Sequence, residues 1–238
     1  MRVRITFSKS GALKYIGHLD LNMVWERATR RAGLPLAYSQ GFHPQPKMTF
    51  ASALPLGFSS HCEVMDMRLN QDEDLASLFV QLQNALPAGI GIIKVESVDE
   101  HEPALQTQVL SAEYEVILKE TPDVSSINQK IDEVMACQSL LRQRRGKSYD
   151  LRPLIEALSL TPLVPSVENG DPTPAHPPKI QRTWSEAQGG EGYLMVFMRL
   201  AAREGATGRP EEVLDALGIP IEHTRVKRTR LIFKNQAW

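Results

Sequence analysis

Polar and apolar residues first alternate along the chain and then recur with helical spacing. Residues 2–7 alternate strictly, which is the period-two pattern of a half-buried strand. Apolar residues then repeat at helical spacing from Leu21 to Ala32, directly after Asp20, a residue type favoured at helix N-caps. Gly33 suits the left-handed turn that ends a helix. The pattern therefore predicts a strand, followed by a helix that Asp20 caps.

The apolar patterns of the two halves of the chain follow the same order. Alternating or continuous apolar runs predict further strands at residues 48–53, 62–69, 90–98, 113–119, 139–145, 147–160, 193–201 and 223–233, with a short helix over 151–158 as an open alternative. Apolar stripes predict further helices at residues 72–85, 125–136 and 209–218. We therefore expect an α+β fold of two tandem ferredoxin-like αβ sandwiches, each an antiparallel sheet with helices on one face. The expected domains are residues 1–104 and 105–238.

Two segments rich in proline and glycine interrupt these elements. Residues 39–47 hold two prolines and a glycine within nine positions, which excludes regular structure there. Residues 161–192 hold six prolines and four glycines, and we expect a long irregular insertion in the second domain. The composition of this insertion is that of a linker, but a functional loop stays open as an alternative.

The overall composition is that of an ordinary globular protein. Of 238 residues, 42% are hydrophobic and 23% are charged. The chain has no apolar run of about 18 residues that would span a membrane, and its first residues lack a signal-peptide core. Its two cysteines, Cys62 and Cys137, exclude a disulfide framework and a cluster held by several local thiolates. We therefore expect a cytoplasmic protein without a membrane partner.

The formal net charge of −1 hides an uneven distribution of charge. Residues 1–47 hold eight basic and two acidic residues, whereas residues 48–120 hold three basic and twelve acidic ones. In the last predicted strand, alternation places Arg228 and Arg230 on one face and Arg225 with Lys227 on the other. These four cations are therefore not expected to line one groove.

The first predicted helix carries the most distinct basic cluster. Arg27, Arg30 and Arg31 lie at i, i+3 and i+4, so they share one face, and planar guanidinium groups suit contact with phosphate. This face either binds an anionic polymer, or stays solvated, or pairs with the acidic segment 63–74. The candidate phosphate-binding or base-stacking residues are Lys9, Arg27, Arg30, Arg31, Phe42, Lys47, Arg145, Lys147 and Arg152.

Three residues are candidates for proton transfer: His18, Asp20 and His43. An imidazole near a helix N-terminus loses proton affinity, which favours the neutral form that acts as a base. These residues, with His61 and Cys62, would form a metal site only by long-range convergence, because no pair has the spacing of a metal motif. The chain also lacks a phosphate-binding loop and a dinucleotide fingerprint. We therefore expect no metal and no cofactor.

Several runs of residues together resemble a known family. These runs are Phe7-Ser8-Lys9, Gly17-His18-Leu19-Asp20-Leu21, Arg30-Arg31-Ala32-Gly33-Leu34-Pro35, Gly41-Phe42-His43-Pro44-Gln45-Pro46-Lys47, Ala53-Leu54-Pro55-Leu56-Gly57, Glu63 and Arg228-Thr229-Arg230. They resemble the bacterial radical SAM-linked protein family, whose uncharacterised members are encoded beside, or fused behind, a radical SAM enzyme. The resemblance covers nearly the whole chain. The chain departs from the family at Gly17, where serine is usual, and near Gln45, where the family has a second histidine.

The resemblance implies a radical SAM enzyme as partner and work on RNA or ribosomes. The chain lacks the three-cysteine motif that binds the cluster of such an enzyme, so radical chemistry would belong to the partner. The leading hypothesis is an accessory protein that binds tRNA or rRNA for modification or processing, with His18 and Asp20 holding the Gly41–Lys47 loop to the helix. Two alternatives stay open. One is a metal-independent RNA-processing or RNA-modifying enzyme that uses His18 or His43 as general base, and the other is a protein-binding adaptor without RNA contact.

Overall fold

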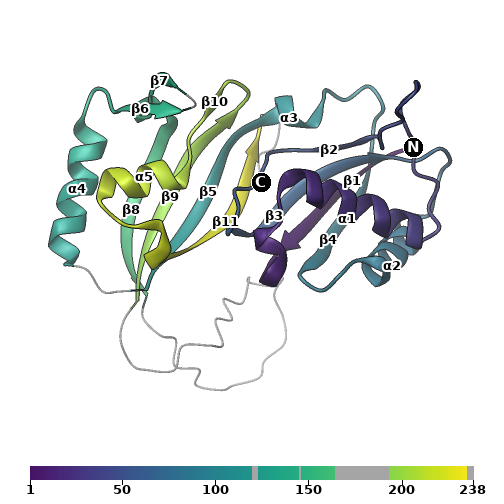
Figure 1. Cartoon of the computed structure of the whole chain (residues 1–238), viewed down its shortest axis with the longest axis horizontal. Helices are drawn as coiled ribbons and strands as arrows, with labels where there is room; N and C mark the ends of the chain where they lie inside the picture. Colours follow the sequence, from purple (N-terminus) through teal and green to yellow (C-terminus); the bar gives the residue numbers. More distant parts are fainter. Residues whose placement is uncertain (120–122, 145, 164–192, 235–238) are drawn as a thin grey trace, which may run out of the picture.

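A nine-stranded sheet forms the body of the protein, and helices cover one of its faces (Figure 1). The computed structural model describes residues 1–119, 123–144, 146–163 and 193–234. The elements of the N-terminal half are β1 (Arg2–Lys9), a 3-10 turn (Gly11–Tyr15), α1 (His18–Arg31), β2 (Met48–Phe50), β3 (Ser59–Arg68), α2 (Leu75–Ala85) and β4 (Ile90–Val98). A short helix, α3 (Leu105–Gln108), leads into the second half.

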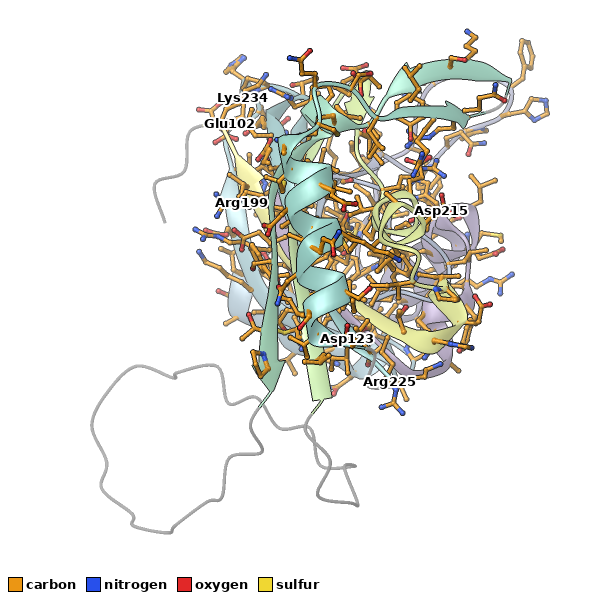
Figure 2. The ribbon with its side chains drawn as sticks, turned by 90° about the vertical axis from the view of Figure 1, so that its left-hand side faces the viewer. Glu102, Asp123, Arg199, Asp215, Arg225 and Lys234 are labelled. Carbon is orange, nitrogen blue, oxygen red and sulfur yellow. The ribbon has the colours of Figure 1, made fainter. Side chains whose placement is uncertain are left out.

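The C-terminal half adds the remaining strands and two longer helices. Its elements are β5 (Val109–Leu118), α4 (Val124–Ala136), β6 (Leu141–Arg144), β7 (Lys147–Asp150), a 3-10 turn (Arg152–Leu154), β8 (Ile155–Leu163), β9 (Tyr193–Arg203), β10 (Ala206–Thr207), α5 (Pro210–Leu217), a second 3-10 turn (Ile221–His223) and β11 (Thr224–Phe233). Strands β6 and β7 form a separate two-stranded sheet. Viewed along the length of the molecule, Asp215 of α5 lies on one side of the large sheet and Arg199 of β9 on the other (Figure 2).

The two halves meet within the sheet. The strand order is β10-β9-β5-β11-β3-β1-β4, with β2 added beside β3 and β8 beside β9. Neighbouring strands are antiparallel except β11 and β3, which pair in parallel at Lys227–Ser59 and Arg228–Ser60. The predicted α+β class, with a large and mostly antiparallel sheet, is therefore confirmed. The two sheets that we expected form one, because β11 and β3 pair.

An irregularity in β11 corrects the predicted faces of its cations. Arg228 lies opposite Tyr114 of β5, and Arg230 lies opposite the adjacent residue, Glu113, so β11 has one extra residue at this point. An extra residue of this kind is a β-bulge, and it shifts the alternation of side chains by one position. Arg228 and Arg230 consequently lie on opposite faces, contrary to the alternation that the sequence predicts.

Each half has its own apolar core between the sheet and its helices. In the N-terminal half, Trp25 of α1 packs edge to face on Phe7 of β1, with ring centroids 4.9 Å apart. In the C-terminal half, apolar residues of α4 and α5, such as Ile131 and Leu214, pack on the buried face of β5, β9 and β11. The four longer helices, α1, α2, α4 and α5, therefore lie over these cores, and the short helix α3 contacts β2 and β9.

The first helix begins earlier than the sequence predicts. Gly17 is the N-cap of α1, and Asp20 is the third helical residue, whose Oδ2 accepts a hydrogen bond from the Gly17 N–H at 3.3 Å. Asp20 as N-cap is therefore wrong, although its carboxylate still satisfies a backbone N–H group at the helix start. Gly33 has the predicted left-handed conformation, with φ of 72°.

The first three residues of the predicted insertion, 161–163, belong to a strand instead, because β8 continues to Leu163. Its remaining part, residues 164–192, lies outside the described residues, and so does Arg145. Within the described part of the chain, none of the helices has the length and apolar character needed to cross a bilayer.

Candidate nucleic-acid interface

The outward face of α1 carries the predicted arginine cluster. The helix buries Leu21, Trp25 and Ala28 against the sheet, and this orientation leaves Arg27, Arg30 and Arg31 exposed. Arg27 makes no ion pair or hydrogen bond with any residue in the described ranges. The cluster therefore faces solvent.

The other two arginines of this cluster are held by nearby groups. Arg30 Nη2 lies 3.0 Å from Glu26 Oε1, one helical turn earlier, and the Arg30 side chain is 72% exposed. Arg31 Nη2 donates to the Ala85 carbonyl at 2.5 Å, at the last residue of α2. A cation near a helix C-terminus interacts favourably with the helix dipole. Arg31 thus joins the two helices, while Arg30 keeps most of its surface free.

The acidic segment 63–74 pairs with other arginines. Asp66 accepts hydrogen bonds from Arg2 Nη2 at 2.6 Å and from Arg4 Nε at 2.8 Å, and Glu63 pairs with Arg228. None of the ion pairs within the described ranges joins this segment to α1. The alternative that the α1 arginines pair with this segment is therefore wrong.

The Pro-rich loop at residues 39–47 is attached beside this face. The Tyr38 hydroxyl donates to Glu26 Oε1 at 3.0 Å, so Glu26 binds both the base of the loop and Arg30. The Lys47 N–H donates to the Ala37 carbonyl at 2.8 Å and closes the other side of the loop. Phe42 is 102% exposed, more than any other large hydrophobic residue in the described part of the chain.

Exposed cations and the aromatic ring therefore belong to one region. Lys47 is exposed at the end of the loop, and His43 is exposed next to Phe42. Since Glu26 joins the loop base to the arginine face, the cations of α1 and the loop belong to a connected surface. We refer to Arg27, Arg30, Phe42, His43 and Lys47 as the α1-loop surface.

His18 and Asp20 do not hold the loop to the helix, and this expectation is wrong. The His18 ring packs edge to face on Phe50, with centroids 5.2 Å apart, and Asp20 binds the backbone at the helix start. Glu26 and Tyr38 make the link instead, eight residues or about 12 Å along the helix from His18. Among the contacts of the described residues, none brings His18, Asp20 and His43 together.

Three other predicted phosphate ligands lie elsewhere in the structure. Lys9 is only 1% exposed and donates from Nζ to the Ile16 carbonyl at 3.2 Å. Burial lowers the pKa of Lys9; the nearby Glu63 opposes this effect and Arg228 adds to it. Arg152 uses its guanidinium to bind the carbonyls of Ile155 and Met135, at 3.0 and 2.8 Å. Only Lys147, on β7, is exposed. Lys9 therefore offers no surface to an external phosphate.

The sequence reasoning missed a buried ion pair where the two halves meet. Arg228 is fully buried, and it binds Glu63 through Nε at 2.9 Å and through Nη2 at 2.5 Å. Its Nη2 also donates to the Ser52 carbonyl at 3.0 Å. Glu63 and Arg228 both belong to the runs that carry the family resemblance, which was the available signal. This pair shares its surroundings with Lys9, so the centre of the molecule holds two cations and one carboxylate.

The same centre contains Cys62 and Tyr114. Burial raises the pKa of the Cys62 thiol to about 11, and it outweighs the opposite effect of the nearby Arg228. Burial likewise raises the pKa of Tyr114. Both groups are therefore neutral at physiological pH, and Cys62 is not an activated nucleophile. Within the described ranges, no three His, Cys, Asp or Glu side chains are grouped in a way that would hold a metal ion.

Comparison with known proteins identifies a family. Residues 2–191 match a family of uncharacterized proteins conserved in bacteria (DUF2344), and the chain belongs to this family. No curated protein matches the chain.

Two solved structures show distant likeness. A chain of the "Crystal Structure of a Cbf5-Nop10-Gar1 Complex" is similar with a TM-score of 0.47 and 11% identity, over 98% of this chain and 50% of that one. This chain thus spans about half the length of its match. The "Crystal structure of putative glycine cleavage system transcriptional repressor" is similar with a TM-score of 0.21 and 10% identity, over 99% of this chain and 98% of that one. Neither likeness carries an argument about function.

Proposed function

We propose that this protein is a non-enzymatic accessory protein that binds RNA, tRNA or rRNA, for modification or processing by a radical SAM partner. One observation carries the RNA-binding part. The fully exposed ring of Phe42 stands on a loop that Glu26 and Tyr38 attach to the arginine face of α1. Single-stranded RNA offers phosphates to cations and base faces to aromatic rings, so it matches both parts of the α1-loop surface.

The partner follows from the family resemblance of the sequence. The runs around Gly17–Leu21 and Gly41–Lys47 resemble those of radical SAM-linked proteins, and the chain itself has no cysteine motif for a cluster. We therefore assign the radical chemistry to a separate enzyme and the recognition of RNA to this chain.

The architecture supports two similar units, divided at residues 104 and 105. The N-terminal half has the strand order β4-β1-β3-β2, and the C-terminal half has β11-β5-β9-β8. When the short strands β6, β7 and β10 are set aside, both halves have the order fourth, first, third and second strand, with one helix after the first strand and one before the last. We propose that each half is a ferredoxin-like sandwich, and that β11, the edge strand of the second, joins β3 of the first.

The test is binding of a fluorescent single-stranded oligouridylate by the full chain over a range of salt concentrations. Affinity is expected to fall as salt rises, because bound cations release counterions from phosphate. The variant Arg27→Ser/Arg30→Ser is expected to bind about tenfold more weakly with a flatter salt dependence. Arg209→Ser removes a cation at the start of α5 and serves as the control with unchanged binding.

Three outcomes would contradict parts of this proposal. Binding without salt dependence, or equal binding by the double variant, would remove the α1-loop surface as an RNA site. No binding of RNA together with binding of the partner enzyme would favour an adaptor. Cleavage or modification of the RNA by the chain alone, lost in His18→Ala or His43→Ala, would show an enzyme instead of a binder.

A further inference from the structure

The bulge in β11 places cations on the face of the sheet opposite α4 and α5. Arg225, Lys227 and Arg230 lie opposite Ile117, Glu115 and Glu113 of β5, which alternate with buried core residues and so share one face. Without the extra residue, Arg230 would face the core side with Arg228. The three cations therefore line one face of a single strand.

The next strand extends this surface. Arg199 of β9 lies opposite Glu113, and its Nη2 is 2.5 Å from Glu113 Oε1, yet its side chain stays 42% exposed. Phe197 lies opposite Glu115 and is half-buried on the same face. Arg199 lies on the side of the sheet away from α5, and Arg225 lies at the lower end of the sheet (Figure 2). We refer to Arg199, Arg225, Lys227 and Arg230 as the sheet-face cations.

The charges on this face are only partly neutralised. Glu113 pairs with Arg199, Lys227 lies opposite Glu115, and Glu156 accepts a hydrogen bond from Ser111 on the same face of β5. At least three carboxylates therefore stand beside these four cations. Arg225 and Arg230 are exposed and have no ion pair or hydrogen bond within the described ranges. The imidazole of His61 lies close to Lys227 and Glu115. Its partial burial and the charge of Lys227 lower its pKa against the opposite effect of Glu115, which disfavours a further cation here. The face keeps a net positive charge.

We infer that this face is a second RNA-contact surface, on the opposite side of the sheet from α1, and the inference rests on the proposed function. Arg225 and Arg230 are separated by about 15 Å along the strand. At about 3.4 Å per phosphate in a stacked strand, this distance spans four or five phosphates. The half-buried ring of Phe197 adds a flat apolar surface between the cations for one base.

The composition of the face favours a polyanion over a protein partner. None of the large hydrophobic side chains that are exposed in the described ranges belongs to β5, β9 or β11. Protein interfaces have an apolar centre, whereas nucleic-acid interfaces are polar and positively charged. Among polyanions, the protein already has an RNA-binding candidate in the α1-loop surface, and a strand of RNA that contacts both faces would bind more tightly than at either alone.

The experiment compares two double variants of the full chain with oligouridylate as the probe. Arg225→Ser/Arg230→Ser is expected to bind about tenfold more weakly than the wild type, with the salt slope reduced by about 1.4, because two phosphate contacts are lost. Combined with Arg27→Ser/Arg30→Ser, the losses in free energy are expected to add. Arg225→Lys/Arg230→Lys keeps the charge and is expected to keep the salt slope. Arg209→Ser again serves as control.

The outcomes separate this inference from the proposed function. If Arg225→Ser/Arg230→Ser binds as the wild type does while the α1 variant is weakened, the sheet-face inference is overturned and the proposed function stands. If neither variant changes binding, both the inference and the proposed function fail.

A second experiment measures binding of the same variants to vesicles of phosphatidylserine and phosphatidylcholine. Binding to vesicles that depends on Arg225 and Arg230, without such dependence for RNA, would also overturn the inference. Because Arg225 and Arg230 are exposed and have no partner within the described ranges, their replacement is expected to leave the folded state intact. Thermal unfolding of each variant checks this.

Discussion

Two arginine–glutamate pairs in this protein have the same chemistry and different surroundings. At the joint between the halves, which is the place where β11 pairs with β3, the side chains of Arg228 and Glu63 are 0% and 3% exposed. On α1, those of Arg30 and Glu26 are 72% and 24% exposed. The buried guanidinium also binds carbonyls of residues 52 and 53, so all its donors serve the fold. The exposed one keeps surface for a ligand. A basic residue is thus available for binding only where the fold leaves it outside.

The comparison also explains why charge along the sequence misleads. In the sequence, Lys9 and Arg228 are basic residues like Arg27. In the structure, their positions on β1 and β11 bury both of them, whereas Arg27 is exposed. A buried charge is tolerated only with a partner, and Glu63 provides it. An exposed pair adds little to stability because water screens it.

The largest expected effect is on stability. Glu63→Gln keeps the size of the side chain but leaves the buried Arg228 without its counter-charge, and it is expected to cost about 3–5 kcal/mol of unfolding free energy. Urea unfolding followed by circular dichroism measures this loss. Glu26→Gln is the matched control and is expected to leave stability nearly unchanged. Equal losses of unfolding free energy in the two variants would show that burial does not distinguish the two ion pairs.

The next effect concerns the exposed ring. Phe42→Ala removes a stacking surface and is expected to weaken binding of oligouridylate by about 1–3 kcal/mol, with an unchanged urea midpoint. Val80→Ala is the control, since Val80 is an apolar residue of α2 that is 56% exposed. A lower urea midpoint without loss of affinity would show that Phe42 serves the fold.

A smaller effect is expected at the start of α1. Asp20→Asn weakens the interaction of a carboxylate with the first turn of the helix and is expected to cost about 0.3–1 kcal/mol of stability. Affinity for RNA is expected to stay the same, because the hydrogen bond that Asp20 makes within the described residues is to the Gly17 backbone. A large loss of affinity with normal stability would restore Asp20 to the candidate site.

The smallest effect is a change in chemical reactivity at the joint. Cys62 has its pKa raised to about 11 by burial, so the folded protein keeps this thiol protonated after an unfolded chain has ionised it. Its contribution to stability is therefore present below pH 9 and lost as the pH rises towards 11. At pH 8, iodoacetamide is expected to alkylate Cys62 much more slowly in buffer than in urea, as measured by mass spectrometry. Equal rates would show an accessible thiolate.

Local patterns predicted much of the fold, and long-range pairing accounts for what they missed. The alternation at residues 2–7 and the stripe from Leu21 to Ala32 gave β1 and α1 because each element buries one face of its own sequence. The parallel contact of β11 with β3 has no local pattern, since only two residue pairs form it. Arg230 was assigned to the wrong face because a bulge depends on the partner strand.

The candidate site was predicted less completely than the fold. Helical spacing placed Arg27, Arg30 and Arg31 together because i, i+3 and i+4 neighbours share a face. The hydrogen bond between Glu26 and Tyr38 joins residues twelve positions apart, and the periodicity of the sequence does not predict it. Lys9 follows a buried alternation in β1, so its burial was readable in principle from the neighbours Ile5 and Phe7.

The position of β11 also sets an order for folding. This strand lies between β5 and β3, and contacts such as Ser59 with Val226 close a loop of 167 residues. Bringing such distant segments together lowers the entropy of the chain before the contacts between them can stabilise it. Contacts of this range therefore form slowly. The joint between the halves is therefore expected to close last, after each half has collapsed around its own hairpin and helices. Until then Arg228 stays hydrated, which gives the folding chain a further, transient cation that the native fold later buries.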